Sequence, residues 1–108
     1  MSDSWEVFYT NEARNDLKKL DKSTRIQVVQ AVEKTRKNPL PISEGGYGVP
    51  LGKKNGNDLT GCLKIKLKKT GIRVVYQLRR TEKGMVIIII GARANSTVYK
   101  KAAQRLNG

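Results

Sequence analysis

The sequence predicts an α+β fold in which a helical hairpin near the N-terminus packs on a four-stranded antiparallel sheet, with a short helix at the C-terminus. The first half carries apolar residues at helical spacing, whereas the second half alternates apolar and polar residues at strand spacing. Met85–Ile90 is an unbroken, mostly β-branched apolar run, typical of a strand buried on both faces. At 108 residues the chain can close one hydrophobic core but not two, so we expect a single domain over residues 1–108.

The N-terminal half contains one predicted strand and two predicted helices. Aromatic and β-branched residues alternate with others from Ser4 to Tyr9, which predicts a short strand. Helical spacing predicts one helix from Asn11 to Leu20, with Thr10 as its N-cap, and another from Ser23 to Lys37. In the second helix we expect the buried stripe to consist of Ile26, Val29 and Val32.

The segment Ser43–Gly61 separates the helices from the strands of the second half. It holds six glycines and Pro50 with little periodicity, so we expect a long, mobile connection there. Beyond it, alternation predicts a strand over residues 63–68, a turn at 69–71 and a strand over residues 72–79. The last element is a predicted helix over residues 97–106, with Asn95 and Ser96 as caps and an apolar stripe of Val98, Ala102 and Leu106.

The two alternating strands also predict which side chains face one another. If their turn centres on Lys69 and Thr70, Lys66 faces Arg73 and Lys64 faces Val75 on the same side of the sheet. A slip by one residue would place Arg73 among the apolar side chains, so that register is disfavoured. Three cations then share one face, which indicates a site for an anion. A solvated lysine face that discourages aggregation is the alternative.

The charge of the chain points to a polyanionic partner. Lys and Arg total 22 against 9 Asp and Glu, a formal net charge of +13, and such a field attracts nucleic acid. No apolar stretch is long enough to span a bilayer, and the N-terminus has no apolar core of the signal-peptide kind. We therefore expect no membrane association and a cytoplasmic location. The single cysteine, Cys62, is expected to be a small buried residue.

The absence of histidine narrows the possible chemistry. It excludes a Ser-His-Asp triad, a Cys-His pair, a histidine zinc site and an imidazole acid/base pair. The nine acidic residues are scattered along the sequence, without the clustered carboxylates that hold magnesium in two-metal nucleases. We expect neither a metal nor another cofactor.

Several strings of the sequence resemble the RelE branch of the RelE/ParE toxins. They are Cys62-Leu-Lys-Ile-Lys-Leu67, Gly71-Ile-Arg-Val-Val-Tyr-Gln77, Gly91-Ala-Arg93 and Val98-Tyr99. The likeness extends from Phe8 to Leu106, although the glycine-rich stretch Gly45–Asn57 is longer than the usual connection of this family. The resemblance implies the RelE/ParE-like fold, which is like that of microbial ribonucleases. It also implies catalytic roles for Lys64, Lys66, Arg73, Arg93 and Tyr99.

The same resemblance implies a function and a set of partners. RelE toxins of type II toxin–antitoxin systems are metal-independent endoribonucleases that cleave messenger RNA in the ribosomal A site and so inhibit translation. The implied partners are an acidic antitoxin, the ribosome and mRNA. Further cations are then candidates for binding RNA, with a solvated protein surface as the alternative for each: Lys68, Lys18, Lys19 and Arg25.

RNA cleavage without histidine or metal is chemically feasible because RNA supplies its own nucleophile, the 2′-hydroxyl group. Nearby cations favour the neutral form of a lysine and the ionised form of a tyrosine, so Lys64 and Tyr99 are both candidate general bases. Arg73 and Lys66 would clamp the phosphate, and Arg93 would stabilise the leaving side. Tyr99 could instead stack on a base or pack on the sheet. The rival functions are a ParE-like inhibitor of DNA gyrase without nuclease activity and a non-enzymatic RNA-binding module.

Overall fold

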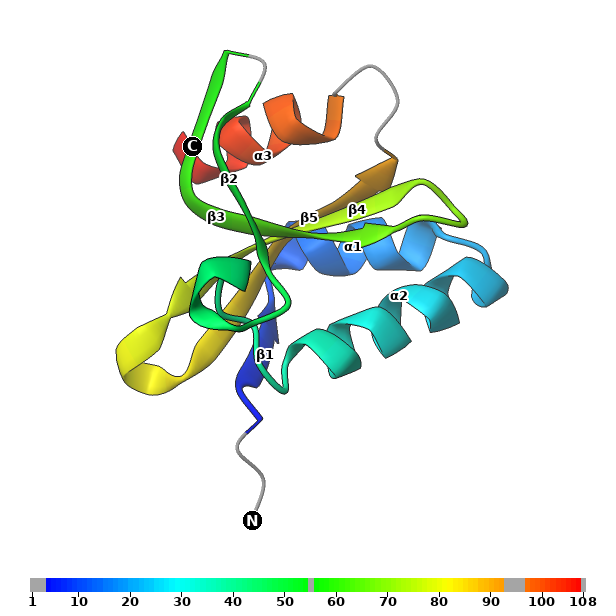
Figure 1. Ribbon diagram of the computed structural model, residues 1–108. Coiled ribbons are helices and arrows are strands. Elements are labelled where there is room, and N and C mark those ends of the chain that lie inside the picture. The colour runs from blue at the N-terminus through cyan, green and yellow to red at the C-terminus, as the bar shows by residue number, and fades with distance from the viewer. Residues whose placement is uncertain (1–3, 55, 93–96, 108) are drawn as a thin grey trace.

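The computed structural model describes residues 4–54, 56–92 and 97–107. Strands and helices follow one another as the sequence predicts, with β2 and two short 3-10 helices in addition (Figure 1). The elements are β1 (Glu6–Tyr9), α1 (Asn11–Lys19), α2 (Lys22–Thr35), η1 (Ile42–Glu44), β2 (Val49–Lys54), β3 (Asn57–Leu67), β4 (Ile72–Arg79), η2 (Arg80–Glu82), β5 (Gly84–Ala92) and α3 (Thr97–Asn107).

Within the described residues the strands form one five-stranded sheet in the order β1-β5-β4-β3-β2. Helices α1 and α2 cover one face of the sheet, and α3 covers the other (Figure 1). The α+β class is therefore confirmed, but two details of the prediction are wrong. The sheet has five strands rather than four, and β1 runs parallel to β5, so the sheet is mixed rather than antiparallel.

The helical hairpin begins as predicted but buries a different stripe. The Thr10 hydroxyl accepts a hydrogen bond from the Ala13 N–H at 3.0 Å, which confirms Thr10 as the N-cap of α1. In α2 the buried residues are Val28, Val32 and Thr35, whereas Ile26 and Val29 are exposed. Val28, Val32 and Thr35 follow one another at spacings of four and three residues, so the buried stripe lies on a different side of α2 from the predicted one and shares only Val32 with it.

The prediction of a long, mobile connection over Ser43–Gly61 is wrong. This segment contains the end of η1, all of β2 and the first residues of β3, and β2 and β3 pair as an antiparallel hairpin. This β2–β3 hairpin rises beside α3 (Figure 1), and Leu51 and Leu59 pack in the same core as that helix. Gly56 has a φ of 80°, a conformation that glycine adopts at no steric cost in a tight turn. The sequence signal for this turn is the Asn55-Gly56 dipeptide, a strong hairpin signal.

The register of the second half is confirmed. Lys66 pairs with Arg73 and Lys64 with Val75 across β3 and β4. Strand β5 lies between β1 and β4, and its first seven residues are all buried, as the apolar run predicts. No helix in the described part of the chain is long and apolar enough to cross a membrane.

Candidate active site

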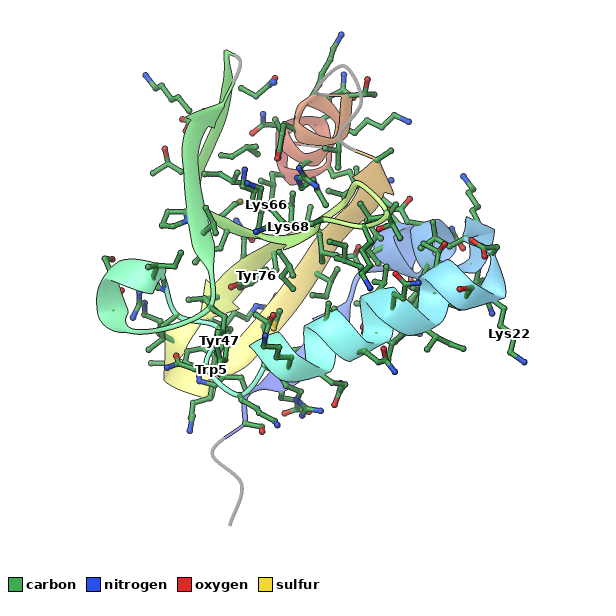
Figure 2. All side chains as sticks on the ribbon, turned by 45° about the vertical axis from the view of Figure 1, so that its right-hand side comes forward. Trp5, Lys22, Tyr47, Lys66, Lys68 and Tyr76 are labelled. Carbon is green, nitrogen blue, oxygen red and sulfur yellow. The ribbon has the colours of Figure 1, made fainter. Side chains whose placement is uncertain are left out.

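The cationic side chains of the central hairpin lie on the face of the sheet that α3 covers. Lys64 and Lys66 alternate with apolar residues along β3, and Arg73 lies opposite Lys66 on β4. Figure 2 shows Lys66 between the β2–β3 hairpin and α3. Lys66 is exposed, whereas Lys64 and Arg73 are buried. The sheet therefore gathers three of the five predicted catalytic residues at one place.

Helix α3 adds Tyr99 to this cluster. Val98, Tyr99, Ala102 and Ala103 are the buried residues of the helix, so α3 is seated on the sheet by its apolar face. The Lys64 Nζ atom donates a hydrogen bond to the Tyr99 Oη atom at 3.4 Å, and it lies 5.6 Å from the centroid of the tyrosine ring. Tyr99 thus both packs on the sheet and contacts a predicted catalytic lysine.

Arg73 has an unusual environment for an arginine. Its guanidinium is buried, and it donates a hydrogen bond from Nη1 to the carbonyl oxygen of the neighbouring Ile72 at 3.2 Å. The Nε–H has no hydrogen-bond partner among the described residues. Because a buried N–H without a partner loses its hydration without compensation, this group requires an explanation. A bound anion would supply the missing acceptor.

The positive charges of the cluster are not balanced by nearby negative charges among the described residues. Within the described ranges, no salt bridge joins Lys64, Lys66 or Arg73 to a carboxylate. Next along β3, Cys62 is buried, as predicted, and burial raises the pKa of its thiol above the ordinary value. The thiol is therefore held neutral and does not offset the positive charge.

The other predicted site residues lie elsewhere. Lys68 is exposed in the turn after β3. Lys18 and Lys19 end α1 and Arg25 lies on α2, so these three cations belong to the helical layer across the sheet from α3. Arg25 Nη2 donates to the Leu20 carbonyl at 3.1 Å. The predicted catalytic residue Arg93 and the predicted caps Asn95 and Ser96 lie outside the described residues.

A partly buried ion pair that the sequence did not reveal connects α3 to α1. Arg105 donates from Nη1 and Nη2 to the Asp16 carboxylate at 2.7 and 3.1 Å, and also from Nη1 to the Ile88 carbonyl at 2.9 Å. The same carboxylate accepts the Ile90 N–H at 3.0 Å. These side chains therefore satisfy backbone groups of β5 beyond the end of β1. No local pattern predicts a pair separated by 89 residues in the sequence.

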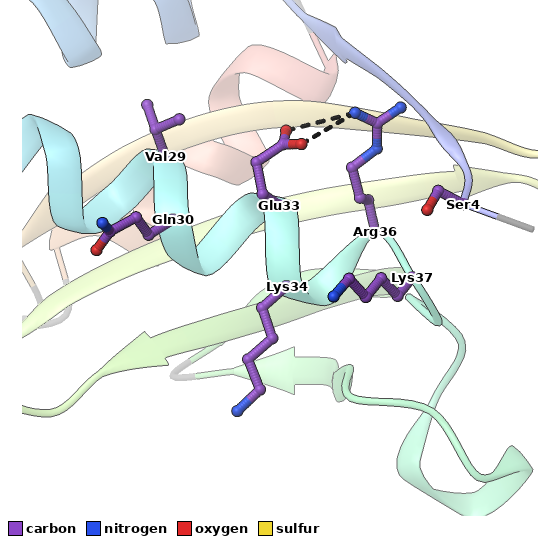
Figure 3. Close-up of a pocket in the computed structure, with 7 residues that line it drawn as sticks. All are labelled: Ser4, Val29, Gln30, Glu33, Lys34, Arg36 and Lys37. Carbon is purple, nitrogen blue, oxygen red and sulfur yellow. Dashed lines mark hydrogen bonds and ion pairs between the residues drawn. The ribbon is translucent and has the colours of Figure 1, made fainter. Parts of the chain in front are cut away.

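A hollow of about 470 Å³ lies along the C-terminal half of α2 (Figure 3). Two of its charged side chains are already paired, because Arg36 binds Glu33 at 3.1 Å, and Arg36 Nε also donates to the Trp5 carbonyl at 2.8 Å. None of the predicted catalytic residues lines it, so we place the candidate site on the α3 face. The lining consists of Ser4, Val29, Gln30, Glu33, Lys34, Arg36 and Lys37.

The chain matches a known family over most of its length. The family model described as ParE toxin of the type II toxin–antitoxin system matches residues 7–96. The chain belongs to this toxin family. Within the RelE/ParE superfamily it is a RelE-type toxin, because its named relatives carry RelE names.

Two curated relatives cover almost the whole chain. A protein of Escherichia coli named as a RelE-like toxin is 29% identical over 94% of this chain and 97% of its own length. The mRNA interferase toxin RelE of Escherichia coli strain K12 is 26% identical over 91% of this chain and 93% of its own length. The relationship is thus distant but spans both proteins.

Solved structures agree with the fold. A mutant of the E. coli toxin RelE in the free state superimposes with a TM-score of 0.69 at 24% identity, covering 95% of this chain and 98% of its own. The toxin–antitoxin complex RelBE2 of Mycobacterium tuberculosis contains a chain with a TM-score of 0.67 at 26% identity, with 85% and 94% coverage. The fold of this toxin is therefore that of RelE.

Proposed function

We propose that this toxin is an endoribonuclease that cleaves messenger RNA in the ribosomal A site and thereby inhibits translation. The observation that carries the proposal is the buried guanidinium of Arg73, whose Nε–H has no partner among the described residues, beside Lys64 and Lys66. A phosphate placed there would accept from the guanidinium and neutralise adjacent cations. The name mRNA interferase, carried by a relative 26% identical to this chain, supports the same activity.

The proposed reaction uses the RNA itself as nucleophile. A base removes the 2′-hydroxyl proton, and the 2′-oxygen attacks the adjacent phosphorus. The bond from phosphorus to the 5′-oxygen breaks, and that oxygen takes up a proton. The products are a 2′,3′-cyclic phosphate and a 5′-hydroxyl, so no water, metal or oxidant enters the balance. The protein must position the phosphate, stabilise the charged phosphorane and move two protons.

The cluster contains side chains suited to these tasks. In the proposal, Lys64 or Tyr99 is the general base, and the two side chains are hydrogen-bonded to each other beside Arg73 and Lys66. Arg73 and Lys66 hold the phosphate, because arginine keeps its charge and presents several N–H donors. Arg93 would stabilise the leaving side. Because Lys64 and Arg73 are both buried in this structure, RNA binding to them requires a local rearrangement of the groups that cover them.

The proposed partners follow from the net charge of the chain and from its similarity to toxins of known structure. The net charge of +13 exceeds what one phosphate site needs, and exposed cations such as Lys18, Lys19, Arg25 and Lys68 could bind ribosomal RNA. Similar toxins crystallise with RelB-type antitoxins, so we propose an acidic antitoxin as the inhibitor of this single-domain toxin. Because the proposed substrate is mRNA on translating ribosomes, we also propose a cytoplasmic location.

The decisive experiment is cleavage of mRNA on programmed ribosomes, mapped by primer extension with EDTA-treated protein. We expect cleavage in the A-site codon by the wild type and a loss of about 100-fold or more for Arg73→Ala and Arg93→Ala. Arg79→Ala is the matched control, because Arg79 is an exposed arginine at the other end of β4, and its rate should not change.

Other outcomes point to the rival functions. If the folded wild type leaves mRNA intact, the nuclease proposal is refuted, and inhibition of DNA gyrase is the next assay, since the matching family model carries the ParE name. If wild type and Arg93→Ala bind RNA equally and neither cleaves it, the toxin is a non-enzymatic RNA-binding module.

A further inference from the structure

A groove of about 300 Å³ adjoins the candidate site at the edge of the sheet. Strand β2 begins at Val49, opposite Lys64, so β3 has no neighbouring β2 residue from Ile65 onward. The groove lies between this open edge, the segment 47–49 and the C-terminal half of α2. Lys64 and Lys66 also line the groove, and because their side chains belong to the cationic cluster on the α3 face, the groove meets the candidate site at the open edge of β3.

An exposed aromatic side chain forms one wall of this groove. Tyr47 is 51% exposed, although its neighbours in the chain are tightly held. Its backbone N–H donates to the Asn38 carbonyl at 2.9 Å, and the N–H of Gly48 donates to the Leu40 carbonyl at 3.0 Å. The hydrogen-bonded backbone of this loop therefore fixes where Tyr47 lies, and packing of its half-exposed ring contributes little.

Two glycines show how closely this loop is fitted. A Cβ atom on Gly46 would overlap the Leu40 carbonyl, and one on Gly48 would overlap the Tyr76 hydroxyl and the Leu63 side chain. The Tyr76 hydroxyl in turn donates to the Pro39 carbonyl at 2.8 Å in the protein interior. A rigid loop presents the Tyr47 ring without a large ordering cost when a ligand binds.

A cation stands over the same ring. Lys34 Nζ, from α2, lies 5.6 Å from the centroid of Tyr47 and also lines the groove. The groove thus combines an exposed ring with a nearby ammonium group, at a sheet edge that two lysines of the cationic cluster also line. Aromatic side chains that stack on bases, beside cations that follow the backbone, are the chemistry by which proteins bind single-stranded nucleic acid.

We propose that Tyr47 and Lys34 form a subsite for a nucleotide of single-stranded RNA next to the phosphate held by Arg73 and Lys66. The inference rests on the proposed ribonuclease function and names a residue pair beyond its catalytic set. The base stacks on the Tyr47 ring, and the Lys34 ammonium moves from the ring to the phosphate of that nucleotide. The exchange is favourable, because base stacking is worth more than an exposed cation–π contact, and the ammonium gains an anionic partner.

The test is binding of a short single-stranded RNA that carries a 2-aminopurine base and 2′-O-methyl groups, which prevent cleavage. Anisotropy gives the affinity, and quenching of 2-aminopurine reports stacking. Tyr47→Ala should lower the affinity about tenfold and remove the quenching, whereas Tyr47→Phe should keep both. Tyr47 is half exposed, so both variants should keep the thermal stability of the wild type.

Lys34 has a matched control on the same helix. Lys34→Ala should lower the slope of log affinity against log salt by about 0.7, the value for one phosphate contact on a single strand. Lys22→Ala should leave the slope unchanged, because Lys22 lies at the opposite end of α2 from Tyr47 (Figure 2).

Three results would overturn the inference. Full affinity and quenching in Tyr47→Ala would remove the subsite and leave the ribonuclease proposal standing. Weaker binding of an acidic antitoxin peptide alone, with RNA binding unchanged, would make this groove a protein-docking surface. No binding of RNA by the folded wild type would also refute the subsite, and cleavage on ribosomes would then decide the proposed function separately.

Discussion

Replacing Asp16 by alanine tests how the structure holds α3 in place. Three hydrogen bonds end on its carboxylate, two from Arg105 and one from the Ile90 N–H. The side chains of Arg105 and Asp16 are only 18% and 12% exposed, so water can replace little of what the substitution removes. Asp16→Ala therefore leaves a largely buried guanidinium without its main partner and a β5 N–H without an acceptor.

The expected effect is large for a small protein. Removing one partner of a fully buried ion pair costs about 3–5 kcal/mol, and the remaining exposure of this pair places the expected loss near about 3 kcal/mol. Total unfolding free energies of such domains are about 5–15 kcal/mol. A loss of this size should lower Tm by roughly 12 °C or more. Asp16→Asn should lose about half as much, since its side-chain oxygen can still accept the Ile90 N–H.

Glu12 provides a matched control on the same helix. Its carboxylate lies 3.6 Å from the Nε atom of the same Arg105, but its side chain is 61% exposed. Exposed ion pairs contribute about 0–1 kcal/mol, so Glu12→Ala should change stability by about 0.5 kcal/mol. Each variant removes one carboxylate that contacts Arg105, and the two carboxylates differ mainly in how deeply they are buried.

Urea unfolding followed by far-ultraviolet circular dichroism measures the difference. Hydrogen exchange should also show that amides of α3 lose more protection than those of α2, because the ion pair fastens α3 to the rest of the structure. Equal, small losses for Asp16→Ala and Glu12→Ala would refute the reasoning, since burial would then not decide the worth of these pairs.

Three further outcomes can be checked by the same unfolding assay. Tyr76→Phe should cost about 1–2 kcal/mol, because the Pro39 carbonyl loses its buried donor. Gly48→Ala should destabilise by more than about 2 kcal/mol, because its Cβ would overlap the Tyr76 hydroxyl and Leu63; a folded variant of unchanged stability would contradict this. Burial raises the pKa values of Cys62 and Tyr76 from ordinary values of 9.0 and 10.0. Stability should thus be full at neutral pH and fall as pH rises above about 9, because the unfolded chain then releases protons that the folded chain retains, and Tyr76→Phe should weaken this fall.

The register of the central hairpin could be predicted because only one pairing separates charge from the core. Lys66 opposite Arg73 keeps Ile65 and Val74 together, and any slip by one residue mixes the two kinds. The same logic located β5, whose apolar run fits only a buried strand. Local sequence patterns that allow only one favourable pairing were therefore sufficient to predict the strands that carry the cationic cluster.

Strand β2 could not be predicted from periodicity. Pro50 and Gly52 interrupt its pattern, and the register shifts between them. The strand exists because it pairs with β3, and the packing of Leu51 and Leu59 beside α3 supports it. The parallel pairing of β1 with β5 is likewise a contact between distant segments, which neither segment encodes alone. The groove beside Tyr47 depends on both the start of β2 and the loop before it, so the spacing of residues along the sequence could not predict this groove either.

Helix α3 both completes and covers the cationic cluster. It brings Tyr99 to Lys64, and the same packing buries Lys64 beneath it. Burying Lys64 and Arg73 with no carboxylate partner among the described residues costs free energy, and the contacts of Arg105 with Asp16 and the Ile88 carbonyl at the other end of the helix help to hold α3 in place despite that cost. An anion bound at the cluster would relieve the repulsion between its cations, whereas the Asp16–Arg105 pair holds α3 over the cluster. If RNA binds at Arg73 as proposed, the contacts that hold α3 in place stabilise the protein but hinder RNA binding. A substitution at Asp16 that weakens these contacts should therefore lower Tm more than it lowers the affinity for RNA.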